Sequence, residues 1–340
     1  NSTNLFIIIF GLIIFTTKWY YPYLIFDEEI EAKIIFESIS DGYLYFAPFK
    51  ALTNLNLNNS FSPLIDNLGT ITIPIGAFVV HFIFYSIIGT YSFVILEFFF
   101  IIFFLIIFYK ISRLLDLNRI QSLAVAIILF NIPNIFQVLN LYNLEYFNVI
   151  FSDFYSLRFP RPIVSTILFF LFIFLILKSD KKNFFTKKNS IIFGIISSLL
   201  FTSYFHAFFL QQIVLIFYLV FKFRSKIIQI LKINISYILV YVLTFLLVSS
   251  PFLINMFFVD ADFLQRQGLI VFDFEKKLIL IKYLFLKLFK IQFLFVLLLS
   301  IFLLFFFNKK NNLINFKKIN LLFLIFYSSI ITPFIFVLIS

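Results

Sequence analysis

Apolar runs about as long as a bilayer is thick recur along the whole chain. A lipid core takes about 20 helical residues to cross, and it offers the backbone no hydrogen-bond partners, so only helices and closed barrels can span it. Barrel strands alternate in hydropathy over about ten residues, and no segment has that pattern. With 62% hydrophobic and only 13% charged residues, the chain is also too apolar for a soluble domain. The sequence therefore predicts an all-α integral membrane protein.

Nine of these runs are candidate transmembrane helices. They are Leu5–Ile25, Tyr91–Tyr109, Gln121–Leu139, Ile163–Leu177, Ile191–Tyr204, Ala207–Phe221, Ile235–Phe258, Ile291–Phe307 and Leu321–Ile339. The fifth and sixth are short, and we expect a tight turn near His206 to join them. The predicted fold is a polytopic bundle in one membrane-embedded domain over residues 1–340. Because residue 1 is Asn and the last residues lie inside an apolar run, we expect the sequence to be part of a longer protein.

Lys and Arg concentrate in four connecting segments, at 110–119, 178–188, 222–232 and 309–318. These segments hold more than half of the 27 basic residues and few of the 16 acidic ones. Basic connections of a membrane protein remain in the cytoplasm. The other connections, which carry most of the acidic residues, are therefore predicted to lie on the outer side.

The segment from Pro74 to Ile88 is a special case among the apolar runs. Counting it as a span would invert the sidedness of every later connection. We therefore expect a helix that starts at Pro74, a residue suited to a first helical turn, and ends near Gly89. This helix would lie in, or dip into, the outer interface. An ordinary span remains the alternative on grounds of length.

The first outer loop, residues 27–90, opens with a run of acidic residues directly after the first span. Ile30, Ile34 and residues 36–39 form an apolar stripe at helical spacing, with acids on the other face. Asp27 would then start an amphipathic helix that rests on the membrane. There it can reach both a lipid head group and an aqueous acceptor. Helix capping is the competing interpretation, since Asp is favoured at that position.

The order of these features resembles the GT-C glycosyltransferases. A first span is followed at once by Asp27-Glu28, then Ala32 and Gly42, and later by a Pro-started interfacial helix that ends at a Gly turn. The resemblance covers roughly the first 120 residues and is strongest to polyprenyl-phosphate-dependent enzymes similar to aminoarabinose transferases and protein O-mannosyltransferases. It implies a GT-C-like bundle with interfacial helices in the first outer loop.

Two features depart from that pattern. Many relatives have paired prolines preceded by a charged residue, where this chain has Ile73-Pro74-Ile75. A second acid that is often found just before the interfacial helix has no clear counterpart, and Asp66 is the nearest acidic residue.

The resemblance implies roles for the acidic start of the first outer loop. Transfer of a sugar from a lipid phosphate to a hydroxyl needs a base near the acceptor and positive charge near the departing phosphate. Asp27 is the candidate base, or alternatively a ligand for a divalent cation such as Mg²⁺ or Mn²⁺, and Glu28 is a second candidate.

Arginines in two other outer loops are candidates for binding the donor phosphate. Arg158 and Arg161 lie in a Pro-containing loop, and guanidinium groups bind phosphate through two parallel hydrogen bonds. Anchoring in lipid head groups is the alternative for both. Arg266 is a third candidate, and it follows an Asp260-Ala261-Asp262 sequence that fits either a metal site or a solvated loop.

Three polar residues in or beside the spans complete the candidates. His206 would face the same outer side as Asp27 and can help position an acceptor, or can be an ordinary turn histidine. Glu97 lies near the outer end of the second span, where a buried acid is a candidate functional group. His81 is expected to be structural. Further on, lysines alternate with Leu, Ile and Phe between Lys276 and Lys290, which predicts a basic amphipathic helix attracted to anionic lipid.

These features together predict a glycosyltransferase that moves a sugar from a polyprenyl-phosphate donor to an envelope glycan, lipid or protein. The expected location is the periplasmic face of a bacterial inner membrane, with no nucleic-acid partner. An O-antigen ligase or polymerase, a transporter or flippase, and a non-catalytic assembly factor are the alternatives. A transporter would have polar residues spread through its spans, whereas the span interiors are expected to be almost purely apolar.

Overall fold

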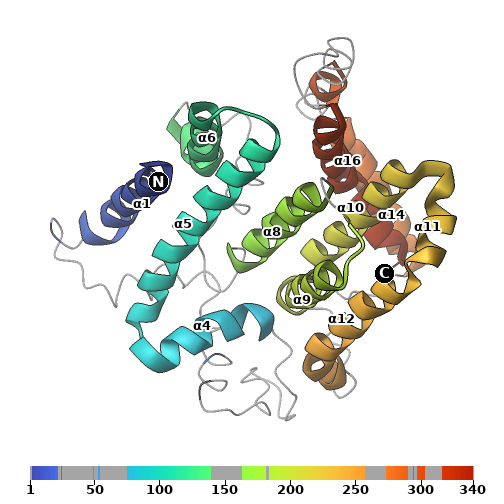
Figure 1. The fold of residues 1–340 in the computed structure, drawn as a ribbon, viewed down its shortest axis with the longest axis horizontal. Coiled ribbons are helices and arrows are strands. Elements are labelled where there is room, and N and C mark those ends of the chain that lie inside the picture. Colours follow the sequence, from blue (N-terminus) through green and yellow to red (C-terminus); the bar gives the residue numbers. More distant parts are fainter. Residues whose placement is uncertain are drawn as a thin grey trace.

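The chain folds into a bundle of helices in a computed structural model (Figure 1). The structure describes residues 2–21, 24, 49, 53, 75–138, 163–180, 184–256, 273–289, 294, 297–302 and 316–339. Helices account for all of the secondary structure within these ranges, which confirms the predicted all-α class for this part of the chain. They are α1 (Ser2–Phe15), the π-helical η1 (Thr16–Tyr20), α4 (Ile75–Ile88), α5 (Tyr91–Leu114), α6 (Arg119–Val138), α8 (Ile163–Asp180), α9 (Lys187–Ser203), α10 (Phe205–Phe223), the 3-10 helix η3 (Arg224–Lys226), α11 (Ile227–Ile233), α12 (Ile235–Met256), α14 (Phe274–Leu288) and α16 (Phe316–Ile339).

Several of these helices are long and apolar enough to cross a membrane. Tyr91–Leu114, Phe205–Ile233 and Ile235–Ile254 meet that standard of length and composition. Shorter apolar helices occur at Thr3–Phe15, Gly76–Ile88, Arg119–Asn131, Val164–Ser179 and Phe323–Ile335. Membrane-spanning character is therefore supported within the described residues, while the number of nine spans stays a prediction.

The predicted turn between the fifth and sixth spans is present. Tyr204 alone interrupts the helices, in an extended conformation (φ −156°, ψ 102°). Both helices are longer than hydropathy predicted, at 17 residues for α9 and 19 for α10. The reason at the start of α9 is a cap, because Thr186 Oγ1 accepts a hydrogen bond from the Asn189 N–H at 3.2 Å and so includes Lys187 in the helix. A hydropathy-based prediction stops at the first charged residues, whereas capping hydrogen bonds set the actual boundary of the helix.

The connection between α5 and α6 is a tight turn held by local hydrogen bonds. Asp116 has a left-handed backbone (φ 67°), and the Leu117 N–H donates to the Ser112 carbonyl at 3.3 Å, which is the pattern of a Schellman motif. Asn118 Oδ1 then accepts from the Gln121 N–H at 2.8 Å, and Gln121 Oε1 accepts from the Asn118 N–H at 3.1 Å. This reciprocal capping box starts α6.

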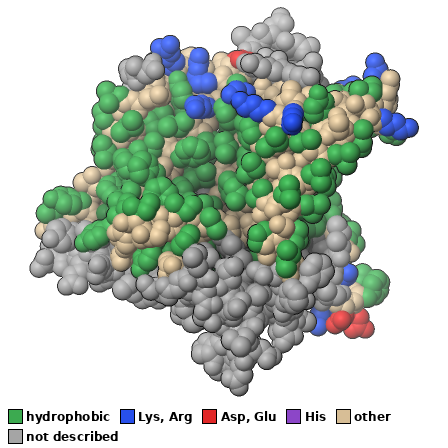
Figure 2. Space-filling model, turned by 60° about the horizontal axis from the view of Figure 1, so that its bottom comes forward, with side chains coloured by type: hydrophobic (Ala, Val, Ile, Leu, Met, Phe, Trp, Pro, Cys, Tyr) green, Lys and Arg blue, Asp and Glu red, His purple; other side chains and the backbone are tan. Residues whose placement is uncertain are grey.

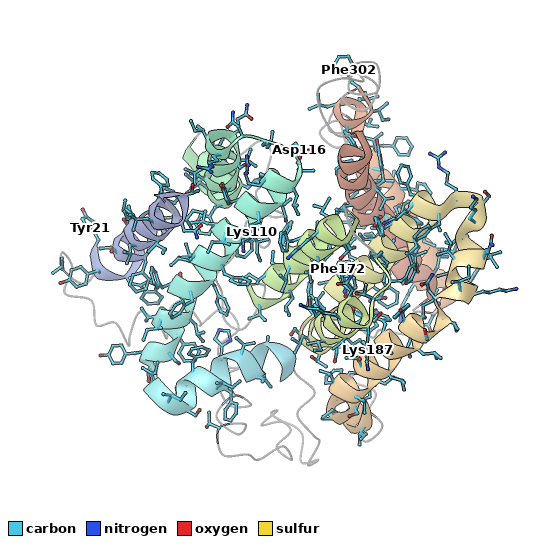
Figure 3. All side chains as sticks on the ribbon, in the orientation of Figure 1. Tyr21, Lys110, Asp116, Phe172, Lys187 and Phe302 are labelled. Carbon is cyan, nitrogen blue, oxygen red and sulfur yellow. The ribbon has the colours of Figure 1, made fainter. Side chains whose placement is uncertain are left out.

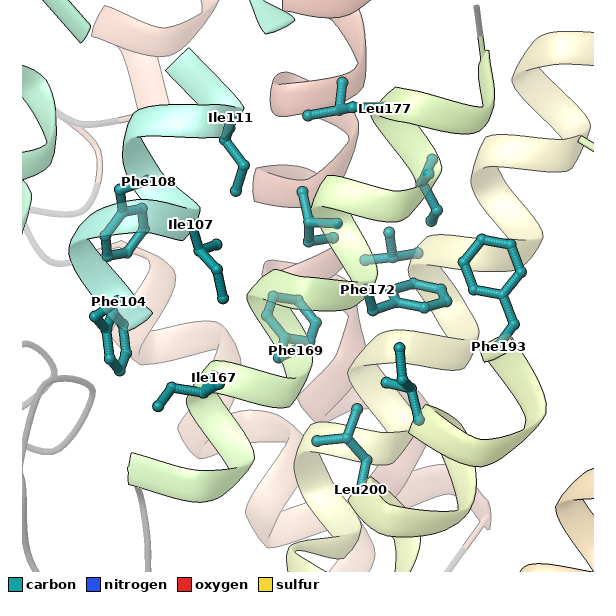
Figure 4. Close-up of a cluster of buried hydrophobic side chains, with 14 of the residues drawn as sticks. Phe104, Ile107, Phe108, Ile111, Ile167, Phe169, Phe172, Leu177, Phe193 and Leu200 are labelled. Carbon is teal, nitrogen blue, oxygen red and sulfur yellow. The ribbon is translucent and has the colours of Figure 1, made fainter. Parts of the chain in front are cut away.

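The main apolar core lies where α8 packs between α5 and α9 (Figure 4). The Phe108 and Phe170 rings meet edge-on at 4.7 Å between α5 and α8, and the Phe172 and Phe193 rings meet at 5.4 Å between α8 and α9. Such aromatic pairs contribute about 0.5–1.5 kcal/mol each beyond their buried area. Phenylalanine, which makes up 58 of the residues, therefore serves as packing material between these helices.

The basic connections that the structure describes come together at one end of the bundle. Lys110 of α5 and Lys178 of α8 both lie over the ring of Phe174, with Nζ 6.0 and 5.7 Å from its centroid. Lys222 at the end of α10 lies 5.7 Å from the Phe184 ring, just before α9 begins. Figure 2 shows Lys and Arg side chains gathered along one edge above a broad hydrophobic surface. We call this edge, with Lys110, Lys178 and Lys222, the basic end. We call the opposite end, where α4 lies and where the described helices border the predicted acidic loops, the acidic-loop end.

Helices α9 and α12 approach each other closely at Gly194. A Cβ at this position would lie 2.8 Å from Thr244 Cβ and 2.9 Å from the Tyr241 carbonyl oxygen. Small residues permit this kind of close backbone approach between membrane helices. The α9–α12 contact therefore requires glycine for reasons of space.

We predict that Gly194→Ala destabilises the protein by about 1–3 kcal/mol, because the added methyl group overpacks the contact. A loss of stability would be informative, because in an unobstructed helix the same substitution raises the stability by about 1 kcal/mol. Gly11→Ala is the matched control, because its Cβ would meet only side-chain atoms, at 3.0 Å from Ile102 and 3.8 Å from Ile101. Thermal unfolding in detergent, followed by circular dichroism, measures both variants, and a Gly194→Ala protein as stable as the native one would contradict the close approach.

Candidate functional site

An aromatic cluster fixes both flanks of the segment that contains Asp27. Trp19 of η1 and Phe49 are buried together with Phe78 of α4 and Phe93 of α5. The Phe49 ring lies 5.6 Å from the Phe93 ring and 5.0 Å from the Tyr85 ring. Trp19 and Phe49, which flank Asp27 in the sequence, therefore meet in one cluster.

The π-helical turn η1 explains how Trp19 reaches this cluster. Ile7 and Gly11 are buried on one face of α1, and an uninterrupted α-helix would bring position 18 to that face. The π turn adds one residue, so that Trp19 is turned inward and is only 4% exposed. Tyr21, at the margin of the molecule in Figure 3, is 54% exposed. The helix thus directs an indole against α4 and α5.

Helix α4 extends between the last turn of α9 and the first turn of α5. At its start, a Cβ on Gly76 would lie 2.7 Å from Ser203 Oγ and 2.9 Å from the Leu199 carbonyl oxygen. At its end, Gly89 adopts φ +70° and its N–H donates to the Tyr85 carbonyl at 2.8 Å, which confirms the predicted helix end. The 14 residues of α4 span about 21 Å.

Both neighbours of α4 contact it at the acidic-loop end. Helix α5 runs from its junction with α4 toward Lys110, and α9 runs from Lys187 toward its contact with α4. Helix α4 therefore begins and ends at the same end of the bundle, and its interfacial position stays a prediction.

Two ionisable side chains are buried where α4 packs on α5. The His81 ring is 5.9 Å from the rings of both Phe93 and Phe100, and its Nδ1–H donates to the Ala77 carbonyl at 3.1 Å. Burial lowers the pKa of His81 to about 4, so the imidazole is neutral at pH 7. Glu97 is 7% exposed and shares a face of α5 with Phe93 and Phe100 through helical spacing. An acid and a neutral imidazole thus lie along the same helix contact.

A second polar cluster lies between α9, α10 and α12. Gln211 Nε2 donates to Ser197 Oγ at 2.7 Å, and Tyr241 Oη lies 3.1 Å from the same oxygen and 3.0 Å from Gln212 Oε1. The tyrosine has one proton and Gln212 Oε1 can only accept, so Tyr241 donates to Gln212 and accepts from Ser197. Ser197 therefore connects the three helices.

This cluster differs from the expectation that span interiors are almost purely apolar. Ser197 and Gln211 are 0% exposed. Hydropathy averaging over a span hides single polar residues, and the adjacent pairs Ser197-Ser198 and Gln211-Gln212 were the signal that could have revealed them.

Most of the predicted site residues lie outside the described ranges. These are Asp27, Glu28, Arg158, Arg161 and Arg266, together with Asp260 and Asp262. His206 is described as the second residue of α10, half-buried, with its ring 5.4 Å from the Tyr204 ring. It follows the turn of α9 on which α4 begins, and so belongs to the acidic-loop end. Among the described residues, no three His, Asp or Glu side chains lie close enough together to hold a metal ion.

Comparison with known proteins gives no relative for this chain. No family model, no curated protein and no solved structure matches it.

We predict that Ser197→Ala destabilises the protein by about 1–3 kcal/mol, because it removes the acceptor of a fully buried Gln211 amide. Ser198→Ala is a matched control, since Ser198 is also 0% exposed but its hydroxyl has no hydrogen-bond partner among the described residues. The control should leave stability unchanged or slightly raised. Unfolding titrations in mixed micelles compare the two, and equal losses would show that Ser197 does not hold the helices together.

Proposed function

We propose that this protein is a membrane glycosyltransferase that transfers a sugar from a polyprenyl-phosphate donor to an acceptor of the cell envelope. The observation that carries the proposal is the aromatic cluster of Trp19, Phe49, Phe78 and Phe93. It restrains both flanks of the segment with Asp27 beside α4. Asp27 follows Trp19 by only eight positions, and we propose that its carboxylate acts at the interface where a lipid-linked donor presents its head group.

The charge distribution supports an orientation for this proposal. The described basic connections, with Lys110, Lys178 and Lys222, lie at the end remote from α4, and basic connections of membrane proteins face the cytoplasm. The reaction would then take place on the opposite, periplasmic face of a bacterial inner membrane. Polyprenyl-linked sugars are suited to such a face, because the lipid carries the activated sugar where soluble nucleotide donors are absent.

The proposed reaction is a displacement at the anomeric carbon of the donor sugar. Asp27 accepts the proton of the acceptor hydroxyl as its oxygen forms a bond to that carbon. The bond between the anomeric carbon and the phosphate oxygen breaks, and polyprenyl phosphate leaves with the electron pair. Arg158, Arg161 and Arg266 are proposed to bind the charge that develops on the phosphate. Asp27 and Glu28 are alternatively proposed to hold a Mg²⁺ or Mn²⁺ ion against that phosphate.

His206 is proposed to position the acceptor. Its ring is half-buried at the start of α10, and we propose that it contacts a polar group of an envelope glycan, lipid or protein. His206 follows the turn of α9 that contacts α4. It therefore lies at the same end of the bundle as the cluster of Trp19 and Phe49, which flank Asp27 in the sequence.

We expect Asp27→Asn to lower the transfer rate by about 10²–10⁴-fold, the usual contribution of a positioned base. The assay follows a radiolabelled sugar from polyprenyl-phosphate-linked donors into the envelope fraction of membranes that contain each variant. Asp116→Asn is the control, since Asp116 lies in the turn at the basic end. Native turnover by the Asp27→Asn protein would rule out its role as the base.

We expect Arg158→Gln combined with Arg161→Gln to raise the donor KM by about tenfold or more, because charged hydrogen bonds contribute about 1.5–3 kcal/mol. The acceptor KM should change much less. Arg113→Gln combined with Arg119→Gln, at the basic end, is the matched control. An unchanged donor KM would assign the loop to head-group anchoring.

Transport of a polar substrate is the second candidate function. The buried cluster around Ser197 and Gln211 favours it, since transporters carry polar groups in their span interiors. Proteoliposomes discriminate the two functions: movement of a fluorescent lipid-linked sugar between leaflets without bond cleavage would support the transporter.

A further inference from the structure

Helix α14 has a continuous apolar stripe along one face. Phe274, Leu278, Ile281, Phe285 and Leu288 follow one another at alternating spacings of four and three residues, which places them in one line along an α-helix. Lys276 and Lys287 lie on the opposite side of the helix, and Lys277 and Lys282 border the stripe. The predicted basic amphipathic helix between Lys276 and Lys290 is thereby confirmed over residues 274–288.

Much of this stripe is not covered by the rest of the protein. No residue of α14 is buried. Phe274 is 75% exposed, Leu278 52% and Phe285 50%. An apolar face of this kind would be strongly unfavourable in water, so something apolar covers it in the working protein.

The position of α14 points to the bilayer as that covering. Its second half packs on α16, where the Phe285 and Phe334 rings meet at 5.0 Å. Phe334 lies near the end of α16, the end remote from the basic residues Lys317 and Lys318 at its start. We expect the basic connection at 309–318 to lie on the same side as the other three, and on that basis this contact puts α14 at the depth of the acidic-loop end.

The charges of α14 favour an anionic surface. Lys276 is paired with Asp273 at 3.1 Å. The remaining lysines, Lys277, Lys282 and Lys287, outnumber the one other acid, Glu275. Lysine stems can lie along the apolar boundary while their ammonium groups reach the head groups.

We propose that α14 is an interfacial helix that inserts its apolar stripe into the outer leaflet and binds anionic phospholipid head groups through Lys277, Lys282 and Lys287. The inference is independent of glycosyl transfer, since it needs only the exposed stripe, its depth and its charge. A second copy of the chain or a partner protein on the same stripe is the competing occupant.

The test uses the absence of native cysteine. Full-length protein with Leu278→Cys or Lys276→Cys, which lie on opposite faces of α14, is spin-labelled and placed in nanodiscs of phosphatidylcholine with or without phosphatidylglycerol. Collision with oxygen and with a water-soluble nickel chelate reports the depth of each label. The same labels are placed in a Lys277→Gln, Lys282→Gln, Lys287→Gln background, and Phe274→Cys replaces Leu278→Cys if that variant does not fold.

In phosphatidylglycerol nanodiscs we expect oxygen to reach the label at position 278 more readily than nickel does, with the reverse at position 276. The label at 278 should be shallower in phosphatidylcholine alone and in the background with the three Lys→Gln substitutions. Equal nickel access at both positions would overturn the proposal, as would shelter of the 278 label from both reagents, which indicates a protein partner. Equal depth in all lipids would overturn the role of anionic head groups.

Discussion

The close contact of α9 with its neighbours is the interaction on which the rest of the bundle depends. In lipid, apolar side chains gain little by leaving one apolar environment for another, so helices associate through tight packing and hydrogen bonds. Helix α9 uses both, with Gly194 against the backbone of α12 and Ser197 bonded to side chains of α10 and α12. Its apolar face contributes to the core with α8. Helix α9, which carries Gly194 and several serines, is thus the common contact surface.

The arrangement of the acidic-loop end follows from that contact. The start of α4 packs on the last turn of α9 at Gly76, and the turn at Gly89 connects α4 to α5. The Trp19–Phe49 cluster then packs on α4 and α5 and restrains the ends of the loop that contains Asp27. The proposed reaction site is therefore supported by helices whose own placement depends on contacts deeper in the bundle.

The sequence predicted the helical class, the turn at the end of α9, the end of α4 at Gly89 and the gathering of basic residues. Each of these depends on a signal that acts over a short distance, such as a hydropathy run, a left-handed glycine or a block of charge. It did not predict the polar cluster at Ser197, because a few hydrogen bonds between distant segments leave no trace in average hydropathy. Helix lengths were underestimated for a related reason, since capping groups such as Thr186 and not hydropathy decide where a helix starts. Of the predicted site, only His206 lies in the described residues, and its role stays a prediction.

The π turn in the first helix has a consequence for how such sequences diverge. One inserted residue would rotate the rest of an α-helix by roughly 100° about its axis, and the π turn absorbs that rotation. Loss of Thr16 or Thr17 would make the π turn unnecessary, because a continuous α-helix would then bring the indole to the inward-facing position. An alignment that ignores such a one-residue gap would pair side chains that face different directions.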